Sequence, residues 1–389
     1  MTLPMARRDF LRMTGYGFAA VPLARGNTEP ARWRFANMLR GDVEEWCDLA
    51  SVPAAVTMLL RDGDVKTLAV GTAHAGATEP VTVDTVFEAG SLGKPVFAFG
   101  VLRLAEAGKL DLDKPLAQYL ELPDTAGDPR VAKITARHVL SHTTGLPNWR
   151  DTHDEPLKTM FEPGERFSYS GEGYFLLQRV VERISGQSIE HFAQEWILRP
   201  LEMKSSSYLW HPAVVPHLAG GHGGKGKEQE TWNRRVGREL FEAAQKAGVD
   251  VDGQTTAEFV ESFKKVEPKE EPVPNSTLPN VAGSLFTTPA DYARFIRHLA
   301  AAPPKEMLKP HVTVKRDLSW ALGWGLEKHA GRTFAWHWGD NYYFQNFVIW
   351  LPGSADALLV FTNGASGKKV YSRVVPAVTG TDWESLVWI

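Results

Sequence analysis

The sequence predicts an α/β (α+β) protein with an antiparallel sheet of five or more strands, flanked by an N-terminal and a C-terminal helix, and with a mostly helical domain inserted. Two apolar segments, 54–60 and 65–70, flank an Arg-Asp-Gly-Asp turn and read as a hairpin. Further strand patterns lie close together near the C-terminus, at 321–327, 333–338, 344–350 and 357–362. The patterns between these two groups are helical or loop-like, which indicates an insertion.

The same patterns predict the domain boundaries. Residues 35–108 and 285–389 together form the sheet domain, with helices at 35–49 and 370–378, and residues 109–284 form the helical domain. Within the latter, about 225–280 reads as an extra helical insertion, because Trp232, Val236 and Leu240 recur at helical spacing before a charged, proline-rich linker. This insertion is either a lid or an oligomer contact.

Composition excludes several classes of partner. A net charge of −3 gives no electrostatic case for nucleic acid or an acidic membrane surface. No apolar run is long enough to span a bilayer, and the single cysteine, Cys47, excludes an intrachain disulfide. The glycine-rich stretch 217–224 lacks both a carboxylate cluster and the end of a phosphate loop. We therefore expect a small-molecule or peptide substrate, no metal and no organic cofactor.

The N-terminal residues predict export. Arg7 and Arg8, followed by a modestly apolar stretch, resemble a twin-arginine signal over residues 1–24, which predicts a periplasmic protein. The alternative is a basic terminus without a targeting role, and then a cytoplasmic protein.

The pattern Ser91-x-x-Lys94 is the first candidate for chemistry. A strand ending near Ala89, a turn at Gly90 and Pro95 in the first turn of an apolar helix would place Ser91 and Lys94 on one helix face. A hydroxyl beside a buried amine of lowered pKa is an activated nucleophile. The alternative is a helix-capping serine with a solvated lysine.

Two further motifs accompany this one. Ser141 to Pro147 reads as a loop rich in side-chain hydrogen bonds, in which His142 is either catalytic or, as we prefer, structural. Tyr169 follows a Pro-Gly turn and precedes a helix, and it could equally be an aromatic plug with a satisfied hydroxyl.

Taken together, these blocks, with Val281–Ile296 and His337-Trp338-Gly339, resemble the serine β-lactamase and penicillin-binding-protein superfamily, in its class C β-lactamase-like and esterase-like branch. The resemblance implies the β-lactamase/transpeptidase-like fold and a serine hydrolase. It implies that Ser91 is the nucleophile of an acyl-enzyme, that Lys94 takes or relays its proton and that Tyr169 acts as acid or base. It further implies an oxyanion hole from the backbone N–H groups of Ser91 and Asp340, and substrate contacts from His337, Trp338, Gly339 and Gly171.

This chain departs from the family's pattern at two of those motifs. Gly171 stands where the family's Tyr-x-Asn has asparagine, and His337-Trp338 replaces Lys-Thr. The first change loses the amide that class C β-lactamases present to the substrate's side-chain amide. The second loses an ammonium and a hydroxyl, which weakens recognition of a penicillin-like carboxylate. We therefore expect hydrolysis of esters or of amide and peptide substrates. The alternatives are a β-lactamase, a D-alanyl-D-alanine carboxypeptidase or D-aminopeptidase, and, from another class, a non-hydrolytic sensor or binding domain.

The aromatic residues around 336–344 suggest an aromatic-walled cleft, although aromatic residues in strands usually belong to the core.

Overall fold

The computed structural model describes residues 33, 39–61, 63–121, 127–150, 155–266 and 275–389. The predicted export signal at 1–24 lies outside these ranges. Within them, no helix has the length and apolarity that crossing a membrane requires.

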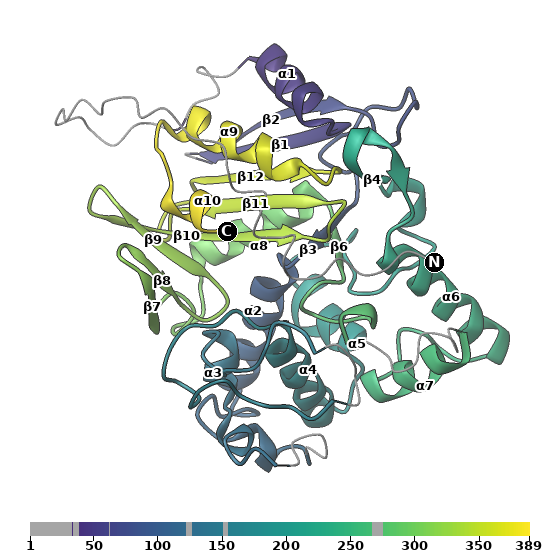
Figure 1. Ribbon diagram of the computed structural model, residues 1–389, viewed down its shortest axis with the longest axis vertical. Coiled ribbons are helices and arrows are strands. Elements are labelled where there is room, and N and C mark those ends of the chain that lie inside the picture. Colours follow the sequence, from purple (N-terminus) through teal and green to yellow (C-terminus); the bar gives the residue numbers. More distant parts are fainter. Residues whose placement is uncertain (1–32, 34–38, 62, 122–126, 151–154, 267–274) are drawn as a thin grey trace. The chain divides into compact units, whose positions relative to one another are not determined.

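An eight-stranded antiparallel sheet dominates the described part of the chain, and the predicted fold class is confirmed. The strand order is β2-β1-β12-β11-β10-β9-β8-β7, so the first hairpin pairs with the last strand (Figure 1). The strands are β1 (Ala54–Arg61), β2 (Asp64–Gly71), β7 (Val312–Lys315), β8 (Leu318–Trp320), β9 (Gly325–His329), β10 (Arg332–Asp340), β11 (Gln345–Trp350) and β12 (Ala357–Thr362).

The sequence patterns did not resolve one edge of this sheet. The single strand predicted at 321–327 is wrong: a turn at 321–324, closed by Ala321 N–H donating to the Trp324 carbonyl at 2.8 Å, separates β8 from β9. Gly323 permits the turn with φ +92°. The apolar run is continuous because the turn residues are themselves buried. Strand β7 had no clear pattern, since it is a short, half-exposed edge strand.

Helices cover both faces of the sheet. The first face packs on α1 (Arg40–Ala50) and α9 (Gly367–Thr379), and the second on α2 (Gly93–Glu106) and α8 (Pro289–Ala301). Alternation along β12 shows the division, because Leu358 faces the first pair of helices and Leu359 the second. Central strands such as β1 and β12 are therefore buried on both faces and read as continuous apolar runs.

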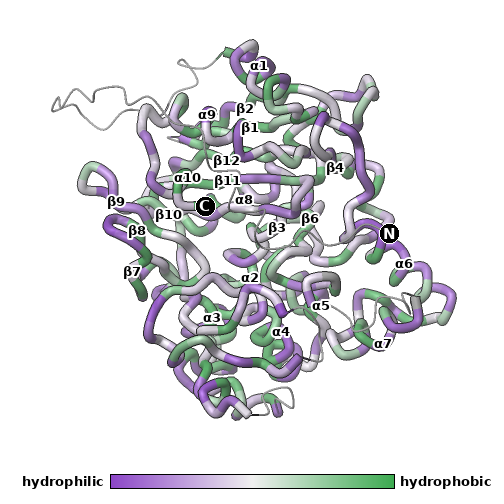
Figure 2. Tube along the Cα trace, in the orientation of Figure 1, coloured by the Kyte–Doolittle hydropathy of each residue, from purple (hydrophilic) through white to green (hydrophobic). Residues whose placement is uncertain are grey.

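The middle of the chain is mainly helical. Its helices of five or more residues include α3 (Ala136–Leu140), α4 (Gly171–Ser185), α5 (Ile189–Ala193), α6 (Trp232–Ala247) and α7 (Thr256–Val266). Helices α6 and α7 lie within the helical insertion expected at 225–280, and Figure 2 shows hydrophilic and hydrophobic residues alternating along them. Their apolar faces enclose a small core that includes Phe175 of α4. The two-domain division remains a prediction.

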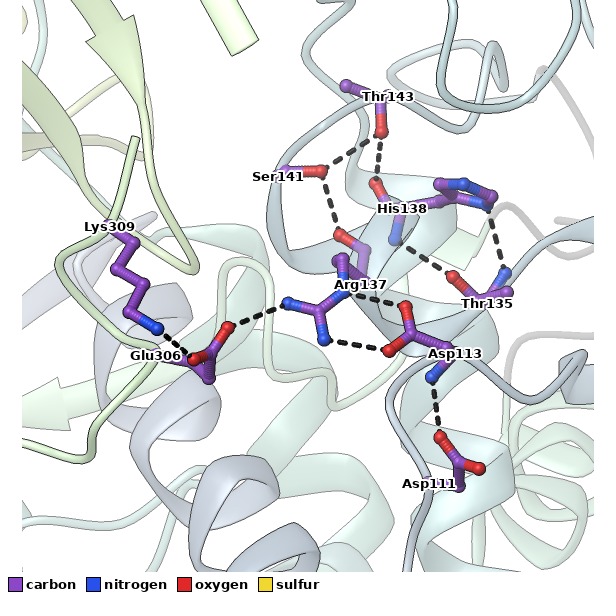
Figure 3. A network of polar contacts seen from close by, with 9 residues as sticks. All are labelled: Asp111, Asp113, Thr135, Arg137, His138, Ser141, Thr143, Glu306 and Lys309. Atoms are coloured by element: carbon purple, nitrogen blue, oxygen red, sulfur yellow. Dashed lines mark hydrogen bonds and ion pairs between the residues drawn. The ribbon is translucent and has the colours of Figure 1, made fainter. Parts of the chain in front are cut away.

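A polar network holds the loop that follows α3 (Figure 3). The Arg137 guanidinium bridges Asp113, at 2.7 Å, and Glu306, at 3.2 Å, so it ties the helical region to the segment before β7. Ser141 Oγ donates to the Arg137 carbonyl at 2.7 Å and lies 2.9 Å from Thr143 Oγ1. These contacts fix the backbone on both sides of His142.

Candidate active site

Ser91 stands at a strand–turn–helix junction, as the sequence predicted. Strand β3 (Phe87–Gly90), paired with β6 (Leu285–Thr287), ends at Gly90 with φ +58°, and α2 begins at Gly93. Ser91 is half-buried just before the first turn of α2. The turn therefore presents the serine hydroxyl at the end of a buried helix.

Lys94 lies directly beside this hydroxyl. Its Nζ is 3.0 Å from Ser91 Oγ and donates to the Ala282 carbonyl at 2.8 Å. The residue is only 1% exposed, and burial lowers the pKa of its amine to about 7. No carboxylate in the described ranges pairs with it, so no charged partner there offsets the loss of hydration. The amine is therefore substantially neutral near neutral pH.

Tyr169 brings a third polar group to the same point. Its hydroxyl oxygen is buried and makes no hydrogen bond of normal geometry to any described residue. Burial raises the pKa of this phenol, and the neighbouring Ser91 side chain lowers it by less. Lys94 Nζ lies 4.8 Å from the centre of its ring. The group is thus a neutral phenol facing the serine.

His142 clamps the backbone on both sides of Tyr169. Its carbonyl accepts from Ser168 N–H at 2.8 Å, and its Nδ1 accepts from Ser170 N–H at 3.1 Å. Its ring stacks on Tyr169 with 4.2 Å between ring centres. Burial, with Lys94 and His337 nearby, holds its pKa well below the usual range. A neutral, buried His142 that holds this backbone is consistent with the structural role preferred from the sequence, and these contacts add that it positions Tyr169.

The N–H of Asp340, one of the two predicted oxyanion donors, faces the turn that carries the other. Asn341 N–H donates to the Phe344 carbonyl at 3.0 Å, and Asp340 pairs with Gln345. Because hydrogen-bonded and non-bonded pairs alternate along antiparallel strands, the Asp340 N–H points away from β11. A Cβ on Gly90 would lie 2.9 Å from the Asp340 nitrogen, so this N–H faces the turn that carries Ser91.

Gly339 permits this close approach. A Cβ at this position would lie 1.8 Å from the Ala89 carbonyl oxygen, which no side chain can tolerate. The glycine therefore sets the spacing between β10 and β3, and with it the position of the Asp340 N–H.

His337 and Trp338 occupy different environments. His337 is fully buried, and burial with Lys94 nearby lowers its pKa to about 3. Its Nδ1 lies 2.7 Å from the Trp338 carbonyl, an acceptor, so the ring is neutral with its proton on Nδ1. Trp338 is half-buried, and its ring lies against Tyr169 with 4.9 Å between centres. No cation therefore stands where the family has its lysine.

These groups open into a cavity of about 280 Å³. Its lining contains Ser91, Lys94, Tyr169, Trp338 and Asp340, so these predicted residues meet at one place. The predicted substrate contacts His337, Gly339 and Gly171 do not line it. Of the aromatic residues around 336–344, Trp338 lines the cavity, Trp336 and Phe344 are buried core residues, and Tyr342 is exposed.

Sequence reasoning missed several lining residues. They are Asn148, Trp149, Asn233, Ser276, Ala282, Gly283 and Asn341. Position 341 could have been found, because it directly follows the predicted oxyanion residue. Asn233 belongs to the predicted insertion, and no motif connects it to the site.

The structure explains the glycine at 171. A Cβ there would lie 2.6 Å from the Trp149 ring, so the indole occupies the space that a side chain at 171 would need. The Gly171 N–H donates instead to Asn148 Oδ1 at 2.9 Å. An asparagine amide thus lies in the cavity wall beside the position where the Tyr-x-Asn motif would have supplied one.

A buried carboxylate lies behind the cavity. Glu88, 1% exposed, accepts from Asn233 Nδ2 and Asn341 Nδ2, each at 3.0 Å, and from the Thr231 hydroxyl. Burial raises the pKa of this carboxyl, and the three donors partly offset that effect. Helix α6 and the β10–β11 hairpin are joined through this side chain.

An antiparallel sheet with helices on both faces, and a serine–lysine pair between the sheet and a helical region, define the β-lactamase and penicillin-binding-protein class of fold. The chain matches the Beta-lactamase family over residues 40–377 and belongs to that family.

Curated relatives and solved structures agree with this assignment. The chain is 34% identical over 190 residues to penicillin-binding protein 4 of Amycolatopsis lactamdurans, covering 45% of this chain and 49% of the relative. It is 30% identical over 184 residues to esterase EstB of Burkholderia gladioli, covering 40% and 47%. The chain thus spans about half the length of these relatives.

Among solved structures, an octameric penicillin-binding protein homologue from Pyrococcus abyssi aligns with TM-score 0.67 at 20% identity, covering 89% of this chain and 78% of that one. A class C β-lactamase from Rhodobacter sphaeroides aligns with TM-score 0.62 at 15% identity, covering 86% and 99%. Both likenesses concern the fold.

Proposed function

We propose that this protein is a serine hydrolase that forms an acyl-enzyme at Ser91 and acts on esters or on amide and peptide substrates. The observation that carries the proposal is the contact between Ser91 Oγ and a buried amine, that of Lys94, at 3.0 Å. A base whose pKa lies near the working pH is suited to accept a serine proton.

In the proposed reaction Ser91 Oγ attacks the substrate carbonyl while its proton moves to Lys94 Nζ. The carbonyl oxygen takes up negative charge between the N–H groups of Ser91 and Asp340. Because Tyr169 is a neutral phenol, it gives its proton to the leaving group as the carbonyl–heteroatom bond breaks, and Lys94 returns a proton to Tyr169. Water then attacks the ester by the reverse path and regenerates Ser91.

The neutral His337 and the indole of Trp338 favour substrates without a free carboxylate. A penicillin-like carboxylate finds no fixed cation on this wall, since Lys94 is engaged with Ser91 and Ala282. We therefore place short-chain esters and amides ahead of β-lactams and of D-alanyl-D-alanine peptides.

Intact-protein mass spectrometry after treatment with a fluorophosphonate tests the acyl-enzyme. We expect one adduct on the wild type and none on Ser91→Ala. Absence of an adduct on the wild type would favour a non-hydrolytic binding domain. With both proteins, p-nitrophenyl esters, D-amino-acid amides and nitrocefin are then compared, and much faster hydrolysis of nitrocefin would reverse our order of substrates.

A further inference from the structure

The amide groups of Asn233 and Asn341 are held in one orientation. Each Nδ2 donates to Glu88 Oε2 at 3.0 Å, and each also donates to the Gly283 carbonyl, at 3.4 Å for Asn233 and 3.0 Å for Asn341. The Gly283 oxygen can only accept, so neither amide can be turned round without losing that bond.

The side-chain oxygens of these two residues remain available to accept hydrogen bonds from a ligand. Within the described ranges no hydrogen bond to either Oδ1 is found, and both residues line the cavity. Asn341 Oδ1 lies over the nucleophile turn, because a Cβ on Gly90 would be 3.2 Å from it. This part of the cavity therefore presents hydrogen-bond acceptors.

Two acidic residues lie near these acceptors. Glu88 lies directly behind the two amides and accepts from both, and Asp340 lines the cavity while its carboxylate oxygens accept from Tyr342 N–H and Gln345 Nε2. Lys94 is the one basic side chain among the described lining residues, and because burial lowers its pKa to about 7, it is only partly protonated near neutral pH. The wall is therefore suited to a group rich in N–H donors and unsuited to an anion.

The direction of the substrate follows from the proposed function, on which this inference rests. The leaving group must face the Tyr169 hydroxyl, and Tyr169 lies beside Trp338 in the cavity wall. The acyl part then extends toward the wall formed by Asn233 and Asn341. We propose that this wall binds a primary ammonium group on the acyl part of the substrate, so that the preferred substrates are aminoacyl esters or amides with a free amine. An ammonium has three donors and no acceptor, which suits two fixed carbonyl oxygens.

Three benzyl esters that differ in one terminal group test this proposal. Glycine, propionate and monobenzyl malonate esters carry an ammonium, a methyl group and a carboxylate on the same carbon. We expect kcat/KM for the glycine ester to exceed that for the propionate ester by about tenfold or more, the effect of one hydrogen bond to a charged group. The malonate ester is expected to be slowest.

Two variants locate the effect. Asn341→Leu and Asn233→Leu remove an acceptor oxygen and should each reduce the glycine-to-propionate ratio several-fold, roughly by one such bond. Gln245→Leu is the matched control, because Gln245 is an exposed amide on the same helix α6 and does not line the cavity. It should leave the ratio unchanged.

Binding to Ser91→Ala tests the wall without altering it, in case the leucine variants fold poorly. We expect the glycine ester to bind this variant more tightly than the propionate ester by calorimetry. Equal affinity, or equal kcat/KM for the two esters on the wild type, would overturn the ammonium site while leaving Ser91 labelling, and thus the proposed function, intact. Failure of Ser91 to react would overturn the proposed function, and the calorimetry would still decide the ammonium site.

Discussion

The buried amine of Lys94 makes a quantitative prediction about pH. With a pKa of about 7 in place of 10.5, roughly three quarters of the amine is neutral at about pH 7.5, against about one part in a thousand otherwise. Burial thus increases the supply of base by nearly three orders of magnitude. The neutral form accepts the Ser91 proton, so acylation should rise with pH and level off above the pKa.

Replacing Lys94 with methionine removes this base and retains an apolar side chain of similar length. We expect kcat/KM for a p-nitrophenyl ester to fall by about a hundredfold to ten-thousandfold, the usual range for general base catalysis. Lys94→Arg should be equally slow, because a guanidinium stays protonated.

The assay is the profile of kcat/KM between about pH 5 and pH 9, a range that brackets the lowered pKa of Lys94. The wild type should gain about tenfold per pH unit below the pKa and show its inflection near 7. Lys328→Met, at an exposed lysine, is the control for loss of a surface charge. An inflection near 7 that persists in Lys94→Met, or a wild type whose rate is flat through this range, would refute the assignment.

Three further substitutions test how the site is built. Gly339→Ala would bring a Cβ to 1.8 Å from the Ala89 carbonyl oxygen, so the variant should unfold at lower temperature and react more slowly with a fluorophosphonate. An unchanged unfolding temperature and labelling rate would contradict the close approach. Gly171→Asn should likewise lower the unfolding temperature without raising nitrocefin hydrolysis, and adding Trp149→Ala should restore stability, because the indole occupies the space needed. His142→Ala should lower kcat about tenfold or more with little change in KM, because His142 no longer holds the backbone beside Tyr169. His142→Asn keeps a hydrogen-bond acceptor and tolerates the positive φ, so it should recover activity. Failure to recover would argue that His142 does not act by positioning Tyr169.

The helices and strands that could be predicted from the sequence are those in which local propensity and burial in the fold favour the same structure. Strand β12, Ala357–Thr362, is apolar on both faces and was bounded correctly. The turn between β8 and β9 was missed because it is buried: Ala321 and Leu322 look like strand core although they form a loop. Periodicity reports burial, and it cannot distinguish a buried turn from a buried strand.

Some features of the candidate site could likewise be predicted from the sequence, and others could not. Ser91 and Lys94 are three residues apart on one helix, so their contact follows from helix geometry. The relation of Trp149 to Gly171 could not be predicted, since nothing in the spacing of the two segments shows that an indole fills the space beside the glycine. The sequence therefore indicated that the site has no asparagine amide at this place, whereas Asn148 lines the same cavity.

The inserted helices are the least predictable part of the site, and they bear most directly on specificity. Thr231 caps α6 by accepting from Arg234 N–H, and its hydroxyl donates a hydrogen bond to Glu88. The start of the helix is therefore tied to β3, the strand just before the nucleophile. Two residues later Asn233 enters the cavity wall. An insertion anchored in this way forms part of the binding surface through a buried carboxylate. Changes in its sequence should therefore alter substrate preference without disturbing the contact between Ser91 and Lys94.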